Sequence, residues 1–176
     1  MEPWLFATER LAVRPKTLAD AEELHPVYGD GDVMRFCGGG FATLRETRDF
    51  VAFHVRHQET HGFSMWALLE RSTRTLAGDV GFLAHEDGIE SGWHLHRNAW
   101  GQGYATEAAR ACLAYGFDQF GFARVSAFTE SANTRSLRVI EKLGMRFVGG
   151  GADGVPAWLE YVMDQPFDAP QPDERA

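Results

Sequence analysis

The stretch that decides the fold is Trp100-Gly101-Gln102-Gly103-Tyr104-Ala105-Thr106-Glu107-Ala108, a turn that follows a predicted strand and opens a predicted helix. Its two glycines allow the backbone to turn sharply and a ligand to approach closely. The free N–H groups of the next helix, and the positive end of its dipole, point to the same place. The combination predicts an anion site, and phosphate is the anion that such turns usually bind.

Two common nucleotide-binding patterns do not fit this turn. The dinucleotide fingerprint G-x-G-x-x-G/A requires Gly or Ala where the chain has Thr106, and the turn follows an antiparallel run instead of opening a βαβ unit. The Walker-type loop G-x-x-x-x-G-K-[ST] is absent from the sequence. On spacing alone, the alternative is a glycine-rich connection that binds no ligand.

Length and composition predict a single domain. The chain has 176 residues, of which 44% are hydrophobic, and this is enough to bury one sizeable core. We expect one domain over residues 1–164 and a flexible tail over residues 165–176, where prolines and acidic residues gather.

Charge and cysteine content narrow the partners. A formal net charge of −8 argues against a nucleic-acid partner and suits an amine-bearing one. Cys37 and Cys112 have neither disulfide nor metal-ligand spacing, so we read both as structural and expect no metal and a reducing cytoplasm. With no leader and no run of 18 apolar residues, we expect a protein without a membrane partner.

Hydrophobic periodicity and capping signals predict the element order β-α-α-β-β-β-α-β-α-β-β. Capping boxes at Thr17 and Thr43 start the first two helices, and Gly62 is placed to end the second. The predicted strands are 10–14, 63–70, 76–84, 89–96, 123–128, 145–148 and 157–163, and the remaining helices follow Gly103 and span 133–143. The fold class is therefore α+β, with a mixed, largely antiparallel sheet.

His94-Leu95-His96-Arg97 and the glycine turn after it resemble the acetyl-CoA signature of the GNAT N-acetyltransferases. The subgroup most similar is the Rim-type ribosomal-protein N-terminal acetyltransferases. The family pattern Q/R-x-x-G-x-G/A maps onto Trp100, Gly103 and Ala105, with tryptophan in place of the usual Gln or Arg. Segments 11–36 and 133–145 also match, so the resemblance covers roughly residues 9–148.

The resemblance implies a GNAT-type sheet of six to seven strands flanked by helices, splayed between the fourth and fifth strands, 89–96 and 123–128. It implies that acetyl-CoA lies in the splay as the acetyl donor. By matched position, Leu95 and Arg97 would pair with the pantetheine arm through their backbone, Gly101, Gln102, Gly103, Tyr104 and Ala105 would hold the pyrophosphate on their amides, Asn133 would hydrogen-bond the arm, and Arg138 would reach the adenosine phosphates.

The expected chemistry is direct acetyl transfer to an amine, which must be neutral to attack. Glu90 matches the position of the family's catalytic glutamate. His94 shares its strand face by the period of two and is the second candidate base. Ile140 stands where the family often has a tyrosine that acts as the general acid. Ser136 is the substitute proton donor that we name. The alternative is that water protonates the leaving thiolate. A solvated charge at Glu90 and a packed ring at His94 are the structural alternatives.

Two questions stay open at this level. The acceptor is a protein N-terminus or a small-molecule amine, and the protein is a monomer or a homodimer. A second hypothesis comes from another class, a non-catalytic acyl-CoA-binding sensor or interaction module, and it is kept because Trp100 and Ile140 depart from the family pattern.

Overall fold

The computed structural model describes residues 4–150 and 158–165. Its strands are β1 (Phe6–Ala7), β2 (Leu11–Arg14), β3 (Met65–Glu70), β4 (Leu76–His85), β5 (Gly88–Leu95), β6 (Arg124–Glu130), β7 (Arg146–Gly150) and β8 (Trp158–Asp164). Its helices are α1 (Ala21–Tyr28), α2 (Leu44–His61), α3 (Tyr104–Phe120) and α4 (Thr134–Leu143), with short 3₁₀ turns η1 (Leu18–Asp20) and η2 (Arg97–Ala99).

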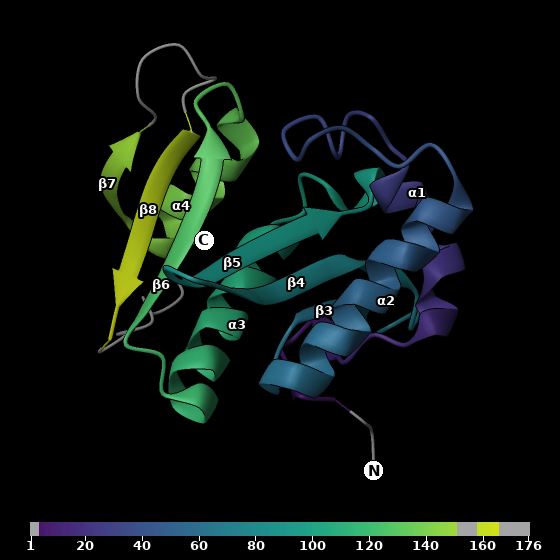
Figure 1. The fold of residues 1–176 in the computed structure, drawn as a ribbon, viewed down its shortest axis with the longest axis horizontal. Coiled ribbons are helices and arrows are strands. Elements are labelled where there is room, and N and C mark those ends of the chain that lie inside the picture. The colour runs from purple at the N-terminus through teal and green to yellow at the C-terminus, as the bar shows by residue number, and fades with distance from the viewer. Residues whose placement is uncertain (1–3, 151–157, 166–176) are drawn as a thin grey trace.

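The eight described strands form one sheet in the order β1-β2-β3-β4-β5-β6-β8-β7. All neighbours are antiparallel except β5 and β6, which are parallel. In Figure 1, α1 and α2 lie over one face of the β3–β4 region, while α3 and α4 lie behind the sheet. This confirms the predicted α+β class with a mixed, largely antiparallel sheet.

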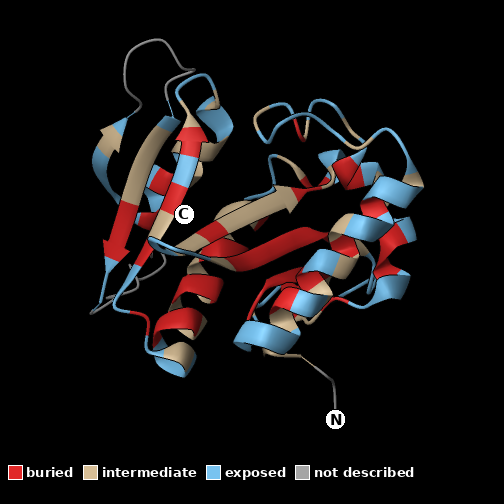
Figure 2. Ribbon diagram, viewed as in Figure 1, coloured by how far each residue is buried: buried red, intermediate tan, exposed pale blue. Residues whose placement is uncertain are grey.

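The main core lies between the sheet and α3. Trp66, Phe82 and Leu113 are fully buried there, and Figure 2 shows buried residues concentrated on β3, β4 and α3. On the other face, α1 and α2 pack together around Leu24 and Val51. A group of polar side chains, described below, lies where this second layer meets β4 and β5.

The local signals that predicted the helices are present in the structure. Both capping boxes form, Thr17 with Asp20 and Thr43 with Glu46. Gly62 ends α2 with a φ of 80°, a left-handed conformation that glycine adopts without strain. The predicted helices and hairpins are therefore confirmed, although the first helix begins as the 3₁₀ turn η1.

One difference from the sequence prediction concerns the number of strands in the sheet. It has eight strands instead of six to seven, because the two-residue β1 adds an edge beside β2. The last hairpin forms, with β8 inserted between β6 and β7. The single-domain boundary stays a prediction, and the predicted tail lies outside the described residues except for Gln165.

The splay predicted between the strands at 89–96 and 123–128 corresponds to β5 and β6. The parallel ladder between them contains one register pair among the described residues, Glu90 with Ser126. Figure 1 shows the two strands diverging toward the C-terminal end of β5. The sheet therefore opens beside the start of α3.

Candidate functional site

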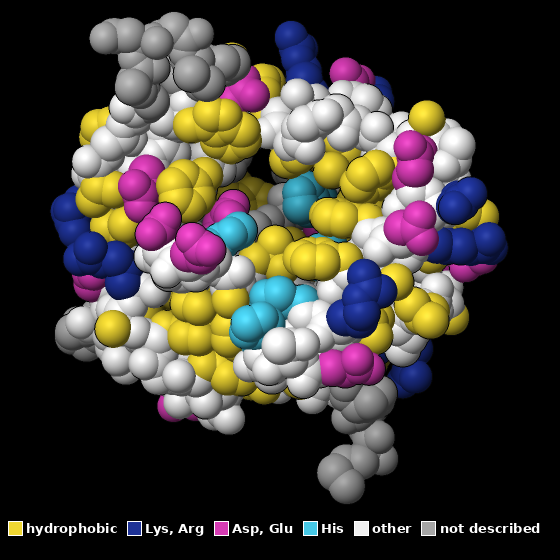
Figure 3. Space-filling model, viewed as in Figure 1, with side chains coloured by type: hydrophobic (Ala, Val, Ile, Leu, Met, Phe, Trp, Pro, Cys, Tyr) yellow, Lys and Arg dark blue, Asp and Glu magenta, His cyan; other side chains and the backbone are white. Residues whose placement is uncertain are grey.

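A cavity of about 600 Å³ occupies the opening between β5 and β6. Figure 3 shows a hollow on this face, with hydrophobic and histidine side chains gathered at its edge. Nine of the predicted site residues line the cavity, namely Glu90, His94, Leu95, Gly101, Gly103, Ala105, Asn133, Ser136 and Arg138. The structure thus brings most of the predicted donor and catalytic residues to one place.

The glycine turn at one end of the cavity is built as an anion site. Gly101 and Gly103 have φ values of 74° and 80°, and a Cβ added at Gly101 would meet no other atom, so the backbone conformation is what requires glycine there. Within residues 4–150 and 158–165, no group accepts a hydrogen bond from the backbone N–H groups of residues 101–106. These free donors at a helix N-terminus fit a phosphate-bearing ligand.

Arg10, which is not part of the cavity wall, holds the turn in place. Its Nη1 donates to the Gln102 carbonyl at 2.9 Å, and its guanidinium pairs with Glu107. The same guanidinium lies 4.7 Å from the centre of the buried Tyr104 ring. The Gln102 carbonyl and the Tyr104 ring therefore tie the turn to Arg10, and neither residue is part of the cavity wall.

The strand edge that faces the opening belongs to β5. The N–H groups of His94 and His96 point toward β4, where they bond Asp79 Oδ1 at 3.1 Å and the Ala77 carbonyl at 2.8 Å. Because the backbone alternates along a strand, the polar groups of Trp93 and Leu95 face the open edge. The Leu95 N–H on this edge can therefore pair with an extended ligand, as the sequence led us to expect for Leu95, while the Leu95 carbonyl accepts a hydrogen bond from Trp100.

Trp100, which departs from the family pattern, has a structural role in the turn. Its indole Nε1 donates to the Leu95 carbonyl at 2.9 Å, and the Arg135 guanidinium lies 4.2 Å from its ring centre. The tryptophan therefore ties the end of β5 to the glycine turn. The free amides of the turn are left unchanged.

Asn133 and Arg97, which the resemblance places against the acetyl donor, make contacts within the protein. Asn133 caps α4, since its Oδ1 accepts the Ser136 N–H at 3.2 Å. Arg97 lies in η2 beyond the end of β5, and its side chain pairs with Asp30 at 2.6 Å and with Asp32 at 2.8 Å. Its hydrogen bond lowers the pKa of Asp30 to about 2. Arg97 is not in the cavity wall, and its backbone contact to the donor stays a prediction.

Glu90 and His94 face the cavity from the same side of β5, with Gly92 between them. Their Cα atoms are four residues apart along the strand, which corresponds to about 13 Å. The Glu90 carboxylate pairs with His85 Nε2 at 2.7 Å. Gly92 lies opposite Gly81 of β4, and a Cβ at Gly92 would already touch the Met65 methyl group at 3.4 Å. On this face of β5, no side chain therefore stands between Glu90 and His94.

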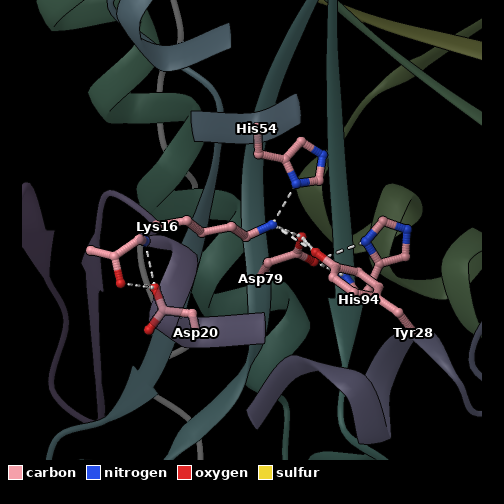
Figure 4. Close-up of polar contacts among 7 residues, drawn as sticks. Lys16, Asp20, Tyr28, His54, Asp79 and His94 are labelled. Atoms are coloured by element: carbon pink, nitrogen blue, oxygen red, sulfur yellow. Dashed lines mark hydrogen bonds and ion pairs between the residues drawn. The ribbon is translucent and has the colours of Figure 1, made fainter. Parts of the chain in front are cut away.

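His94 belongs to a group of side chains that we call the polar cluster, whose other members, Lys16, Tyr28, His54 and Asp79, are buried (Figure 4). Asp79 Oδ2 accepts from Lys16 Nζ at 2.6 Å and from the Tyr28 hydroxyl. Asp79 Oδ1 contacts His94 Nδ1 at 2.8 Å. Lys16 Nζ also lies 2.6 Å from Tyr28 Oη and 2.9 Å from His54 Nδ1.

The charges in the polar cluster shift the pKa of both histidines. Burial opposes the charge on His94, but Asp79 outweighs it and raises the pKa of His94 to about 10. Burial and the charge of Lys16 lower the pKa of His54 to about 2. Despite its burial, Asp79 has its pKa held below the usual range by Lys16 and His94. At neutral pH the His94 ring is thus protonated, which favours a proton donor over the base expected from the sequence.

The sequence reading missed Asp79, Lys16, Tyr28 and His54. The available signal was a charged residue in the middle of an otherwise apolar strand, since Asp79 interrupts the run from Leu76 to Ala84. Cys37, which we read as structural, is exposed and lines the cavity, so its structural role stays a prediction. Cys112 is fully buried in the core, as expected.

The arrangement places an anion site and candidate proton-transfer groups along one cavity. It suits group transfer from a phosphate-bearing donor to a small nucleophile. Among the described residues, no group of three His, Cys, Asp or Glu side chains could hold a metal ion. In the same part of the chain, no helix has both the length and the apolar character needed to cross a bilayer.

Comparison with known proteins gives one family. Residues 10–146 match the model of the acetyltransferase (GNAT) domain. The chain is 34% identical over 147 residues to the uncharacterized protein YkkB of Bacillus subtilis (strain 168), covering 81% of this chain and 85% of that protein. It is 29% identical over 162 residues to the uncharacterized N-acetyltransferase YnaD of the same organism, covering 89% and 93%.

Solved structures agree with this match. A GNAT-family acetyltransferase from Bacillus anthracis has 32% identity and a TM-score of 0.78, with 90% of this chain and 95% of that chain covered. RimL, a ribosomal L7/L12 alpha-N-protein acetyltransferase, has 16% identity and a TM-score of 0.76, with 92% and 93% covered. The second likeness is one of fold alone.

Proposed function

The chain belongs to the GNAT family of N-acetyltransferases, and on that basis we propose that it transfers the acetyl group of acetyl-CoA directly to a primary amine. The observation that carries this proposal is the cavity between β5 and β6, whose lining includes Gly101 and Gly103 of the glycine turn, where backbone N–H groups are free, together with Glu90 and His94. An anion site and proton-transfer groups in one cavity suit a diphosphate-bearing acyl donor.

The donor site uses the residues expected from the family resemblance. When bound, acetyl-CoA supplies the acetyl group as an activated thioester. The amides of Gly101, Gln102, Gly103, Tyr104 and Ala105 hold its pyrophosphate, and Leu95 and Arg97 pair with its arm through the backbone. Asn133 and Arg138 contact the arm and the adenosine phosphates from α4. The free amides and the open β5 edge support this assignment.

Glu90 acts as the general base. Its carboxylate accepts, directly or through one water, the proton that a neutral acceptor amine loses as its nitrogen bonds to the acetyl carbon. The contact with His85 Nε2 orients the carboxylate. Ser136 and His94 are the proton donors available in the wall.

The acceptor enters from the open side of the cavity, over an aromatic rim. Phe128 and Trp158 are 41% and 39% exposed and both line the cavity, together with Phe36 and Phe50 on the opposite side. An open, partly apolar entrance fits either the first residues of a protein chain, as in the Rim-type subgroup, or a small apolar amine. A panel of peptide and small-molecule amines distinguishes these two acceptor classes.

Calorimetric titration tests the donor site. We expect acetyl-CoA to bind the purified protein, and acetyl-pantetheine, which lacks the diphosphate, to bind far more weakly. Absence of acetyl-CoA binding would contradict the proposal. Tight binding without release of CoA on any amine would instead support the non-catalytic sensor or interaction module.

A further inference from the structure

We propose that Asp79 is a positioning residue for acetyl transfer, which holds the His94 ring so that His94 Nε2–H faces the cavity as the proton donor for the departing thiolate. This inference rests on the proposed function. It names the group that supplies the acid in a chain where Ile140 occupies the position of the family tyrosine and is fully buried.

Asp79 anchors His94 at two points. Asp79 Oδ1 accepts the His94 backbone N–H at 3.1 Å and lies 2.8 Å from ring Nδ1. The two residues are direct neighbours in the β4–β5 ladder, so this contact is built into the sheet register. With Nδ1 committed to a carboxylate, only the other ring nitrogen can exchange a proton with a ligand. Figure 4 shows that nitrogen on the side of the ring away from Asp79.

Access to solvent differs sharply between the two partners. Asp79 is fully buried, whereas the His94 side chain is 17% exposed and lines the cavity. The carboxylate therefore acts only through His94. This is the arrangement in which a buried acid fixes the orientation and charge of an imidazole that performs the chemistry.

Lys16 does not compete with His94 for Asp79, because the two side chains contact different carboxylate oxygens. An ammonium group has three donors, and Lys16 Nζ has three neighbours within hydrogen-bond distance: Asp79 Oδ2, Tyr28 Oη and His54 Nδ1. His54 can accept only as a neutral ring, in agreement with its lowered pKa. Lys16 and Tyr28 use Oδ2, which leaves Oδ1 for His94.

The remaining charged or titratable neighbours of His94 are few. Tyr28 of α1 places its ring edge-on at 5.9 Å, and Cys37, in the loop after α1, contacts the His94 ring. His54 of α2 stays neutral. Lys16 and Asp79 form a neutral pair, so the charge on His94 is the net charge that the cluster presents to the cavity.

The proton balance of the reaction is then closed by this chain's own groups. His94 Nε2 gives its proton to the sulfur as the carbon–sulfur bond breaks and the amine nitrogen bonds to the acetyl carbon. Glu90 accepts the proton that the amine nitrogen loses. Both side chains then exchange protons with water, which restores protonated His94 and ionised Glu90 for the next turnover.

The first test measures the protonation of His94 in the ligand-free protein by NMR, with the ring signals assigned by their loss in His94→Gln. We expect the ring to stay protonated beyond pH 8.5 in the wild type. In Asp79→Asn the pKa should fall toward the ordinary value near about 6.5, whereas in Lys16→Met it should not fall. A wild-type ring that titrates near 6.5 overturns the inference, and so does an unchanged value in folded Asp79→Asn. If Asp79→Asn does not fold, the wild-type titration decides.

The second test separates this inference from the proposed function. In steady-state assays, His94→Gln should lower kcat at least 10-fold, leave acetyl-CoA affinity unchanged and remove the loss of rate at alkaline pH. The matched control is His61→Gln, at the exposed end of α2, which should keep the wild-type kcat. A His94→Gln variant with wild-type kcat and pH profile overturns the donor role, while continued CoA release leaves the proposed function intact.

Discussion

Glu90 of β5 lies opposite Ser126 of β6, and this is the one register pair of their parallel ladder among the described residues. Beyond it the strands separate, and the cavity begins where their hydrogen bonding ends. Glu90 therefore belongs both to the one ladder pair that joins β5 to β6 among the described residues and to the cavity wall. This position is the basis for assigning it the base role.

Substitution of this carboxylate should impair turnover more than donor binding. We expect Glu90→Gln, which keeps the side-chain shape, to lower kcat about 100-fold while the Kd for acetyl-CoA stays within about 2-fold of wild type. His85→Gln, which removes only the group that orients Glu90, should have a smaller effect. Initial rates of thiol release and calorimetry measure the two quantities, and wild-type kcat in Glu90→Gln would remove the base assignment.

The glycine turn should be sensitive to backbone strain in a way that affects donor affinity. Gly101→Ala forces a non-glycine residue to a φ of 74°, at a cost of about 1 kcal/mol, although the added methyl group touches nothing. We expect acetyl-CoA to bind at least 5-fold more weakly.

The matched control for Gly101→Ala is Gly121→Ala, at the other end of α3. Gly121 has a φ of 63°, and a Cβ there also meets no atom. Both variants should lose similar stability in urea unfolding, but only Gly101→Ala should lose affinity. Equal donor affinities in the two variants would argue against the anion site.

The aromatic rim should contribute to acceptor binding alone. Phe128→Ala removes an exposed ring from the cavity wall, so the KM for a good acceptor amine should rise several-fold with acetyl-CoA affinity unchanged. Phe147→Ala is the control, since Phe147 of β7 is 55% exposed and lies outside the wall. If both variants keep the wild-type KM, the acceptor does not cross this rim.

The polar cluster should leave its mark on stability as a function of pH. The pKa of His94, about 10, lies above its unfolded value near about 6.5, so its stabilisation is complete below 6.5 and is lost as pH rises toward 10. Lys16, whose pKa burial lowers, acts in the opposite direction at alkaline pH. The difference in unfolding free energy between wild type and His94→Gln should therefore shrink between pH 7 and pH 10. A difference that grows over this range contradicts the assigned charge.

His54 and Asp79 should make the free energy of unfolding decrease as pH falls below neutral. Both have a pKa below the usual value, so the stability they contribute is present at neutral pH. That of His54 is lost as pH falls from about 6.5, and that of Asp79 is lost below about 3.9. Urea unfolding at pH 7, 5 and 3.5 should show a steady decrease, which His54→Gln should reduce between pH 7 and 5.

Local signals in the sequence were enough for most of the fold. The Thr43–Glu46 capping box and Gly62 determine α2 within a few residues, so its limits could be read from the chain. The two-residue β1 is too short to carry a periodic pattern, and its pairing with β2 is a tertiary contact. The glycine turn could be predicted from the sequence because the nine residues from Trp100 to Ala108 contain both its glycines and the start of the helix that follows.

The polar cluster could not be read in the same way. Lys16, His54, Asp79 and His94 lie far apart in the chain, and only strand register and the packing of α2 over β4 bring them together. A single residue of slippage would turn Asp79 to the other face of the sheet. The raised pKa of His94 depends on that contact, so the sequence alone could not predict it.

The most direct test of the central claim is CoA release from acetyl-CoA in the presence of a panel of primary amines, with the acetylated product identified by mass spectrometry. The panel should include peptides with free N-termini and small apolar amines. We predict that at least one amine gives thiol and acetylated amine in a one-to-one ratio, and that Glu90→Gln abolishes most of this release. Thiol release no faster than in buffer for every amine, from a protein that binds acetyl-CoA, would contradict the account.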